Sequence, residues 1–454
     1  MEKLSLRKYT AVVALLIVLV MTVLDVTVVN VALPVLATEF GISDSLTVWI
    51  VTIYQLLITM LILPLSSVGD MFSYRRTFLT GVVVFTLASA LCAASGNFTM
   101  ILVARAIQGI GAACVMSVNI ALTRLIYPRE ILGRGLALNA MVIASATAAG
   151  PTIAGAILSV TTWHWLFLIN VPFGVAAFFI GRRYLPANPP RDNKCGRRDY
   201  DLVSAIANVL MFGLFFLALG QFKDPRHCTK ELIMLAGCAL TAIFYVRREL
   251  KRKNPMLPVD LFRIRLYTLS ILTSTSSFIA QMLAMVSLPF ILLNSYGFSE
   301  ITTGLLMTPW PLATMIISPL AARFVERHNA GVTAAVGMLV FACGIAMLIM
   351  LGNEGASEWS IVWRMTVCGI GYGMFQTPNN IVMVTATPVS RTGGAGGMQS
   401  TARLVGQTLG ATLVTIIFAV VAGSTAQLVH VCLWTSIGLA IVAGLFSLSR
   451  KSAR

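Results

Sequence analysis

The sequence predicts an all-α protein that crosses a membrane many times. Of its 454 residues, 57% are hydrophobic and 11% are charged, and the mean hydropathy is +0.86. A soluble globule of this length needs more polar surface than this composition provides. Apolar stretches of about 20 residues, the length that a helix needs to cross a bilayer, recur along the whole chain. We therefore expect a polytopic membrane protein with no separate soluble domain.

Fourteen spans are expected, near residues 10–36, 47–68, 77–95, 98–123, 133–160, 164–185, 200–221, 231–248, 267–293, 301–321, 331–351, 359–384, 395–421 and 425–448. On one side of these spans lie 27 Lys and Arg residues, on the other side three, and three more lie within or at the edge of spans. By the positive-inside rule the basic side, with both termini, faces the cytoplasm. The net charge of +16 therefore sets topology and does not indicate a nucleic-acid partner.

Cysteine and histidine usage predicts no cofactor. The eight cysteines contain no CxxC pair, and the four histidines show no metal-ligand spacing. The N-terminal apolar run continues past residue 24 without a convincing cleavage site. We interpret it as a retained first span and not as a signal peptide.

The two halves of the chain resemble each other at an offset of about 255 residues. NVALP (30–34) matches VSLP (286–289), and AAGPTIAG in the fifth span matches VGQTLGA in the thirteenth. Two six-helix bundles related by an axis along the membrane normal are a recurring transporter plan. We expect a first bundle over 1–186, linkers with two inserted helices over 187–262, and a second bundle over 263–454. The inserted pair is expected to be structural, with a part in carrying substrate as the alternative.

Asp25 is the only carboxylate deep within a long apolar stretch. A charge at that depth costs roughly 2.5–3.5 kcal/mol and marks an ion or proton pathway with a partner nearby. Arg105, Gln108 and Asn119 share one face of the fourth span, and we expect Arg105 to pair with Asp25, directly or through water. The pair is either purely structural or a proton switch, in which movement of Arg105 changes the protonation of Asp25.

The loop GDMFSYRR between the second and third spans places Gly69, Asp70, Arg75 and Arg76 in a short cytoplasmic turn. The glycine allows close helix packing, and the carboxylate can stabilise a helix N-terminus. The motif is either an ordinary topology-setting loop or a latch that opens and closes as the halves move.

The fifth span carries a face of small residues with a proline, including Gly150, Pro151 and Gly155. Small residues allow close helix packing, and proline bends a helix. Simple packing and a bending seam between the halves are the two interpretations.

The second half has no deep carboxylate, and its polar residues are amides and hydroxyls. FQTPNN (375–380) is expected to interrupt the twelfth span, which is costly in lipid unless it faces a cavity. We therefore predict an amphipathic central cavity, with helix packing as the alternative for each residue. The candidate lining residues are Asn30, Tyr54, Gln55, Gln108, Asn119, Gln281, Gln376, Asn379 and Asn380.

These motifs resemble those of the major facilitator superfamily, in its fourteen-helix drug:proton antiporter branch. The likeness covers essentially the whole chain and rests on LDVTVVNVALP, GDMFSYRR, RAIQG, GPTIAG and WHWLFLINVPFG. LPVDLFRI, QMLAMVSLPF, LLMTPWPLATM and TARLVGQ are similar to one bacterial subgroup. Tyr74 departs from the loop motif, in which glycine is usual.

The resemblance implies proton-driven export of hydrophobic or monocationic toxic compounds, as in multidrug efflux, across the bacterial inner membrane. Such a protein uses the proton gradient and no cofactor, and we expect a monomer. Asp25 would carry the proton, Arg105 would tune it, Asp70 and Arg76 would gate, and Gly150 with Pro151 would form the bend. The lack of a second acid argues against divalent cations.

The sequence leaves two alternative functions. A dedicated exporter of one endogenous metabolite would use the same fold. A membrane-embedded enzyme or receptor is the remote alternative, because the sequence offers no nucleophile–base set, acidic pair or metal cluster.

Overall fold

The computed structural model describes residues 6–127, 132–186, 201–221, 229–252, 259–325, 329–351, 357–387 and 392–450. These residues are almost entirely helical and include no strand. The first half contains α1 (Leu6–Phe40), α2 (Asp44–Thr47), α3 (Trp49–Met71), α4 (Tyr74–Ala93), α5 (Phe98–Ile126), α6 (Leu132–Val160), α7 (His164–Leu168) and α8 (Asn170–Tyr184). The inserted pair is α9 (Leu202–Gln221) and α10 (Thr229–Leu250).

The 3₁₀-helix η4 (Val259–Arg263) leads into the second half. Its helices are α11 (Arg265–Phe290), the π-helical turn η5 (Ile291–Ser295), α12 (Glu300–Met307), α13 (Pro309–Val325), α14 (Ala330–Ile349), α15 (Glu358–Thr385), α16 (Thr392–Val420) and α17 (Thr425–Leu448). The predicted all-α polytopic fold of two bundles with an inserted pair is confirmed, and all fourteen expected spans are helical.

Thirteen helical spans of the described chain are long and apolar enough to cross a membrane. The helix outside that set is α15, which has 28 residues but carries Arg364 and the amides of FQTPNN. The expected interruption there was wrong, because α15 continues through Pro378 to Thr385. A proline removes one backbone hydrogen bond and bends a membrane helix, but neighbouring helices can compensate for the lost bond.

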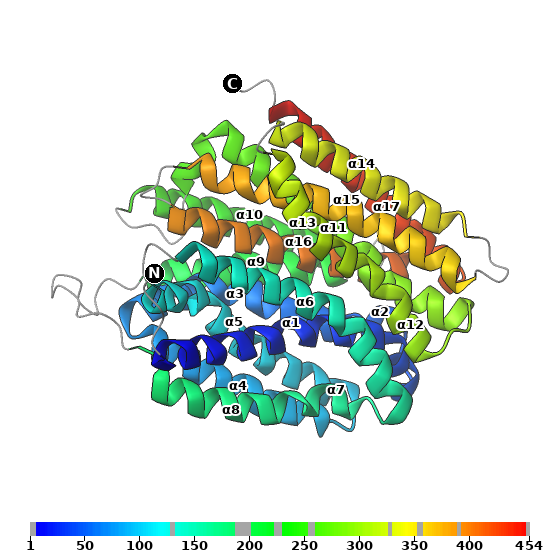
Figure 1. Cartoon of the computed structure of the whole chain (residues 1–454), viewed down its shortest axis with the longest axis horizontal. Coiled ribbons are helices and arrows are strands. Elements are labelled where there is room, and N and C mark those ends of the chain that lie inside the picture. Colours follow the sequence, from blue (N-terminus) through cyan, green and yellow to red (C-terminus); the bar gives the residue numbers. More distant parts are fainter. Residues whose placement is uncertain are drawn as a thin grey trace.

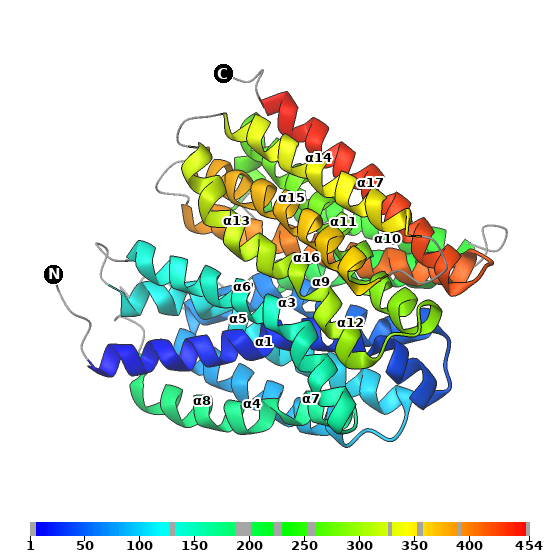
Figure 2. The same ribbon diagram turned by 45° about the vertical axis from the view of Figure 1, so that its right-hand side comes forward.

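The helices run side by side in two groups, with α1, α4, α5 and α8 on one side and α14, α15 and α17 on the other (Figures 1 and 2). α1 begins and α17 ends toward the same end of this bundle. A chain that crosses the membrane an even number of times has both termini on the same side.

The internal repeat is visible in the glycines at which helices approach most closely. A Cβ on Gly111 of α5 would lie 2.5 Å from the backbone N of Phe85 in α4. In the second half, Gly371 of α15 meets the backbone N of Phe341 in α14 in the same way. A second pair of equivalent contacts follows. Gly109 of α5 lies against the backbone of Tyr54 in α3, and Gly369 of α15 lies against the backbone of Trp310 in α13. The two halves therefore use the same helix pairs for their closest packing.

The two halves meet chiefly along two seams, and α1 also packs against α11. At the first, α6 packs against α12: a Cβ on Gly155 would lie 2.5 Å from the carbonyl O of Glu300, and Gly304 lies against the backbone of Pro151. At the second seam α3 packs against α16, where the Thr59 and Thr408 hydroxyls are hydrogen-bonded at 3.1 Å. Tight backbone approach at the first seam leaves no room for a side chain between α6 and α12.

The inserted pair lies beside the second seam. α9 packs against both α3 and α16, and Asn208 Nδ2 donates a hydrogen bond to the carbonyl O of Met60 in α3 at 2.8 Å. α10 packs against α9 and presents large apolar side chains such as Leu240 to its surroundings. This position is consistent with a structural role that shields the seam from lipid.

Asp201, at the start of α9, holds α9 and α10 together. Its carboxylate accepts hydrogen bonds from Nε and Nη2 of Arg248 at 2.9 Å each, and Nε of Arg252 lies 2.8 Å away. Burial acts to raise the pKa of Asp201, but the hydrogen bonds from Arg248 and Ser204 and the charge of Arg252 outweigh it and lower the pKa well below its ordinary value.

Replacing Gly304 by alanine is expected to destabilise the protein, because the added methyl group would overlap the backbone of Pro151. We expect a loss of roughly 1–3 kcal/mol, read as a lower melting temperature in detergent. Gly438→Ala in α17 is the matched control, since a Cβ there meets no atom within 4 Å. Equal effects of the two substitutions would contradict the tight packing of α6 on α12.

Replacing Arg248 by glutamine is expected to lower the melting temperature, because it removes hydrogen bonds that hold α10 against α9. Arg247→Gln is the control and is expected to leave the melting temperature unchanged, because Arg247 is exposed. Because the pKa of Asp201 is lowered on folding, its contribution is complete above its unfolded pKa near ~3.9 and is lost only as the pH falls through the lower folded value. The effect of Arg248→Gln should therefore be constant between about pH 5 and 8. An effect that shrinks within that window would count against this account.

Candidate functional site

Asp25 lies in the middle of α1 and is fully withdrawn from solvent. It forms a direct ion pair with Arg105 of α5, and both side chains have 0% exposure. Its second oxygen, Oδ1, accepts hydrogen bonds from Nε2 of Gln108 at 2.8 Å and from Nδ2 of Asn170 at 3.3 Å. Both oxygens of the carboxylate are thus engaged, which offsets part of the cost of burying the charge.

Arg105 reaches beyond the carboxylate to other elements. Its Nε donates to the carbonyl O of Ile50 in α3 at 3.0 Å, and its Nη1 also donates to Oε1 of Gln108 at 2.7 Å. The guanidinium lies over the ring of Tyr54, 4.2 Å from its centroid, which adds a cation–π attraction. Arg105 therefore has acceptors that remain available when Asp25 is neutral.

Gln108 connects the remaining helix to this cluster. Its Nε2 donates to Oγ of Ser89 in α4 at 2.9 Å as well as to Asp25, and its Oε1 accepts from Sγ of Cys92 at 3.6 Å. With Asn170 on α8, the cluster joins α1, α3, α4, α5 and α8. We call these residues the Asp25 cluster: Asp25, Tyr54, Ser89, Cys92, Arg105, Gln108 and Asn170.

The structure brings three of the predicted site residues, Asp25, Arg105 and Gln108, into direct contact. Tyr54 was assigned to the cavity, but its ring covers Arg105 and its hydroxyl donates to the carbonyl O of Thr22 at 3.4 Å. Asn170 was not predicted from the sequence, although it is an amide within the motif WHWLFLINVPFG and could have been recognised there. Ser89 and Cys92 carry no such signal, since small polar residues are common in membrane helices.

Three predicted cavity residues are buried amides that each have at least one polar atom without a described partner. Oδ1 of Asn30, both amide atoms of Gln55 and Oδ1 of Asn119 form no hydrogen bond to another described residue. Such groups are uncommon in proteins and call for a polar occupant beside them. These amides therefore have hydrogen-bonding capacity available for water or for a polar part of a substrate.

The other predicted cavity residues are placed differently. Gln281, Gln376 and Asn380 are half-buried. Asn379 is buried within the second half, where its Oδ1 accepts from Nη2 of Arg450 at 2.6 Å and its Nδ2 donates to the carbonyl O of Ser270. Both the oxygen and the nitrogen of the Asn379 amide thus have hydrogen-bond partners within the protein.

The loop motif packs within the first half. A Cβ on Gly69 would lie 2.5 Å from Cγ1 of Val118, and the ring of Tyr74 fills the adjacent space. Arg75, in the first turn of α4, donates to the carbonyl O of Arg182 near the end of α8, while Arg76 is exposed. The side chain of Asp70 lies outside the described residues.

The small-residue face of α6 is an interface on two sides. Gly150 lies against the side chain of Thr27 in α1, two residues after Asp25, and Pro151 and Gly155 lie against α12 of the second half. α6 thus connects the helix that carries Asp25 to the other half.

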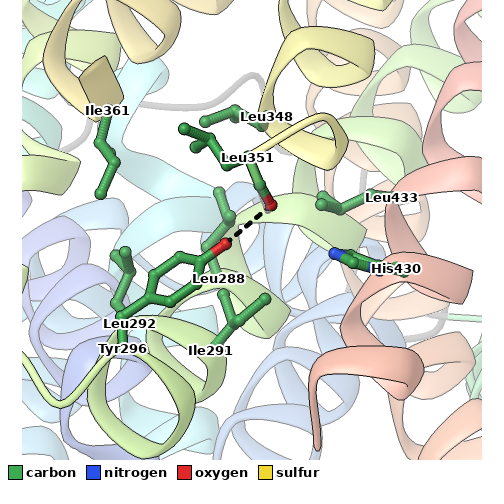
Figure 3. Close-up of a pocket in the computed structure, with 9 residues that line it drawn as sticks. All are labelled: Leu288, Ile291, Leu292, Tyr296, Leu348, Leu351, Ile361, His430 and Leu433. Atoms are coloured by element: carbon green, nitrogen blue, oxygen red, sulfur yellow. Dashed lines mark hydrogen bonds between the residues drawn. The ribbon is translucent and has the colours of Figure 1, made fainter. Parts of the chain in front are cut away.

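One small pocket lies apart from this site, in the second half (Figure 3). Apolar side chains form most of its wall, and Tyr296 in it already donates to the carbonyl O of Leu351 at 3.2 Å. His430 also lines the pocket, and its Nε2 is buried and has no hydrogen-bond partner in the described chain. The pocket has no contact with the Asp25 cluster, which belongs to the first half.

A bundle of membrane-length helices in two repeated halves, with a charge pair at its core, defines a membrane transport protein. The family model of the Major Facilitator Superfamily matches residues 15–411 and, a second time, 269–453, and the chain belongs to this family. Its members are transporters and not enzymes, as expected.

The uncharacterized transporter YebQ of Escherichia coli (strain K12) is 46% identical over 441 residues, which are 97% of this chain and 95% of that protein. The expected bacterial subgroup is thereby confirmed. Multidrug resistance protein Stp of Mycobacterium tuberculosis (strain ATCC 25618 / H37Rv) is 30% identical over 396 residues, 86% of this chain and 72% of that protein. A crystal structure of a POT family transporter in complex with thioalcohol conjugated peptide shares the fold, with a TM-score of 0.74, 15% identity and coverage of 97% and 96%.

Replacing Arg105 by glutamine is expected to destabilise the protein by about 3–5 kcal/mol, because it leaves the charge of Asp25 buried and unpaired. The double variant Asp25→Asn, Arg105→Gln is expected to lose less than Arg105→Gln alone. Melting temperatures of the purified variants in detergent measure this. Arg364→Gln is the control, since the described contacts of Arg364 are hydrogen bonds to Ser360 and a cation–π contact with Trp363, both on its own helix. Additive losses from the two single substitutions would show that the pair is not coupled.

Proposed function

We propose that this chain is a proton-coupled antiporter that exports hydrophobic, toxic compounds across the bacterial inner membrane, as multidrug efflux pumps do. The observation that carries the proposal is the buried Asp25–Arg105 pair at the centre of a transporter fold. A paired carboxylate within the membrane is a default site for proton transfer. The similarity to a multidrug resistance protein supports export of hydrophobic compounds.

The proton step follows from the contacts of Asp25. A proton on this carboxyl group removes its charge, after which Arg105 keeps the carbonyl O of Ile50 and Oε1 of Gln108 as acceptors. The cluster can therefore exist with Asp25 charged or neutral. Because the side chain has 0% exposure, proton exchange with water requires the helices around it to move.

The route by which that movement reaches the other half is a chain of packed helices. Gly150 of α6 lies against Thr27 of α1, and Gly155 of the same helix lies against Glu300 of α12. A shift of α1 that opens the Asp25 cluster would press on α6 and hence on the second half. In this mechanism Gly150, Pro151 and Gly155 form the bending seam.

The loop residues are assigned to gating on the termini side. Arg75 binds the end of α8, so Gly69, Asp70, Arg75 and Arg76 would act by holding α3, α4 and α8 together while the halves separate. The strong bias of Lys and Arg to one side supports a cytoplasmic location for this loop and both termini. The division at 1–186, 187–262 and 263–454 and a monomeric state are part of the same proposal.

A dedicated exporter of one metabolite is the second candidate. The observation that favours it is the set of buried, unpartnered amides at Asn30, Gln55 and Asn119. A site that hydrogen-bonds its substrate rejects analogues that lack the matching groups, whereas a broad-range pump needs little such bonding. Untargeted metabolomics of a deletion strain separates the two: accumulation of one compound favours the dedicated exporter.

Asp25→Asn is expected to reduce proton-driven transport to near background, because asparagine keeps the size of the residue and one acceptor oxygen but cannot carry the proton. Accumulation of a panel of hydrophobic dyes in energised everted vesicles measures it. Asp201→Asn is the matched control, because Asp201 is also buried and its described bonds join α9 to α10, outside the Asp25 cluster. Full transport in Asp25→Asn, or transport that survives collapse of the proton gradient, would refute proton coupling through this residue.

A further inference from the structure

The second half carries a charge within its membrane-spanning helix α16. Arg403 lies on α16 (Thr392–Val420) and is the sixth residue of its apolar span, Met398–Val420. At 1.5 Å per residue, it is about 7–8 Å from the beginning of that span and about 9 Å from its centre. A guanidinium at this depth lies well within the hydrocarbon thickness.

α16 runs along the seam between the two halves (Figures 1 and 2). Leu404, the next residue after Arg403, packs into a cluster of apolar side chains from the first half that includes Met21 and Tyr54. On the other side of the helix, a Cβ on Gly406 would lie 2.7 Å from Cβ of Phe278 in α11. Arg403 therefore sits where the halves meet, and its side chain is half-buried.

No anionic partner for Arg403 exists among the described residues. Its Nε is buried and makes no hydrogen bond to them, and no ion pair joins it to a carboxylate. The titratable group that interacts with its charge is the phenol of Tyr372 in α15. The one carboxylate in the interior of a described span is Asp25, which is already held by Arg105, Gln108 and Asn170.

A guanidinium within a membrane needs an acceptor, and its planar fork fits the two oxygens of a carboxylate, phosphate or sulfonate. We propose that Arg403 binds an acidic group of the transported compound, so that the substrates are hydrophobic anions. Gln407, half-buried one turn further along the same face, adds a second donor beside it. Like-charge repulsion from Arg403 disfavours monocations, which narrows the range expected from the sequence.

This inference rests on the proposed export function but is tested without a proton gradient. The probes are 1-anilinonaphthalene-8-sulfonate and its neutral counterpart N-phenyl-1-naphthylamine, which differ by the sulfonate. Fluorescence titrations use the full-length protein in lipid nanodiscs, with empty nanodiscs subtracted. We expect Arg403→Gln to weaken binding of the sulfonate probe about tenfold, the usual effect of losing one charge-assisted contact, and to leave the neutral probe unchanged.

Two variants complete the experiment. Arg403→Lys keeps the charge without the fork and should give an intermediate affinity for the sulfonate probe, whereas Arg364→Gln should change neither affinity. Equal weakening of both probes by Arg403→Gln, or a sulfonate affinity that survives it, would overturn the proposal. The proposed proton coupling would be refuted independently of this inference if Asp25→Asn transported normally while Arg403→Gln still weakened binding of the sulfonate probe alone.

Discussion

The burial of one carboxylate against one guanidinium determines how the first half of this transporter is built. Removing both charges from water is costly, and the cost is recovered only where the geometry and the surrounding hydrogen bonds are good. Asp25 and Arg105 meet that condition through Ile50, Gln108 and Asn170, which come from separate helices. The position of every helix at this cluster therefore affects the charge pair, and a change in the charge pair acts on all of them.

The two halves share packing but not chemistry. Gly109 and Gly111 of α5 correspond to Gly369 and Gly371 of α15 in their close contacts, an offset of 260 residues. With that offset, Arg105 and Gln108 correspond to Met365 and Cys368, which are buried in an apolar core. The duplicated glycines keep the helices at the same distances in both halves, while the charge pair is confined to one half. In the proposed mechanism the first half handles the proton, and the second half contributes Arg403 to the substrate.

Much of the fold was predictable, because the thickness of the bilayer sets the length of each helix and hydropathy reports it locally. The fourteen spans follow from this. The error at Pro378 arose because the sequence shows the lost hydrogen bond of a proline but not the neighbouring helices that compensate for it. The Asp25–Arg105 contact could be expected by elimination, since few charges lie deep in the spans. Asn170, Ser89 and the carbonyl of Ile50 could not, because nothing local marks them as partners of that pair.

By itself, the sequence determined the membrane class, the positions of the membrane spans, the repeat and the few charges that must find partners within the membrane. These properties depend on composition and on spacing along one helix. The tertiary structure decided which groups are partnered and which are not: Asp25 is bonded across separations of 80 to 145 residues, while Asn30, Gln55 and Arg403 keep polar atoms without a described partner. Hydrogen bonds between helices require placement to within a few tenths of an ångström. Only the packing of the whole bundle sets distances at that scale.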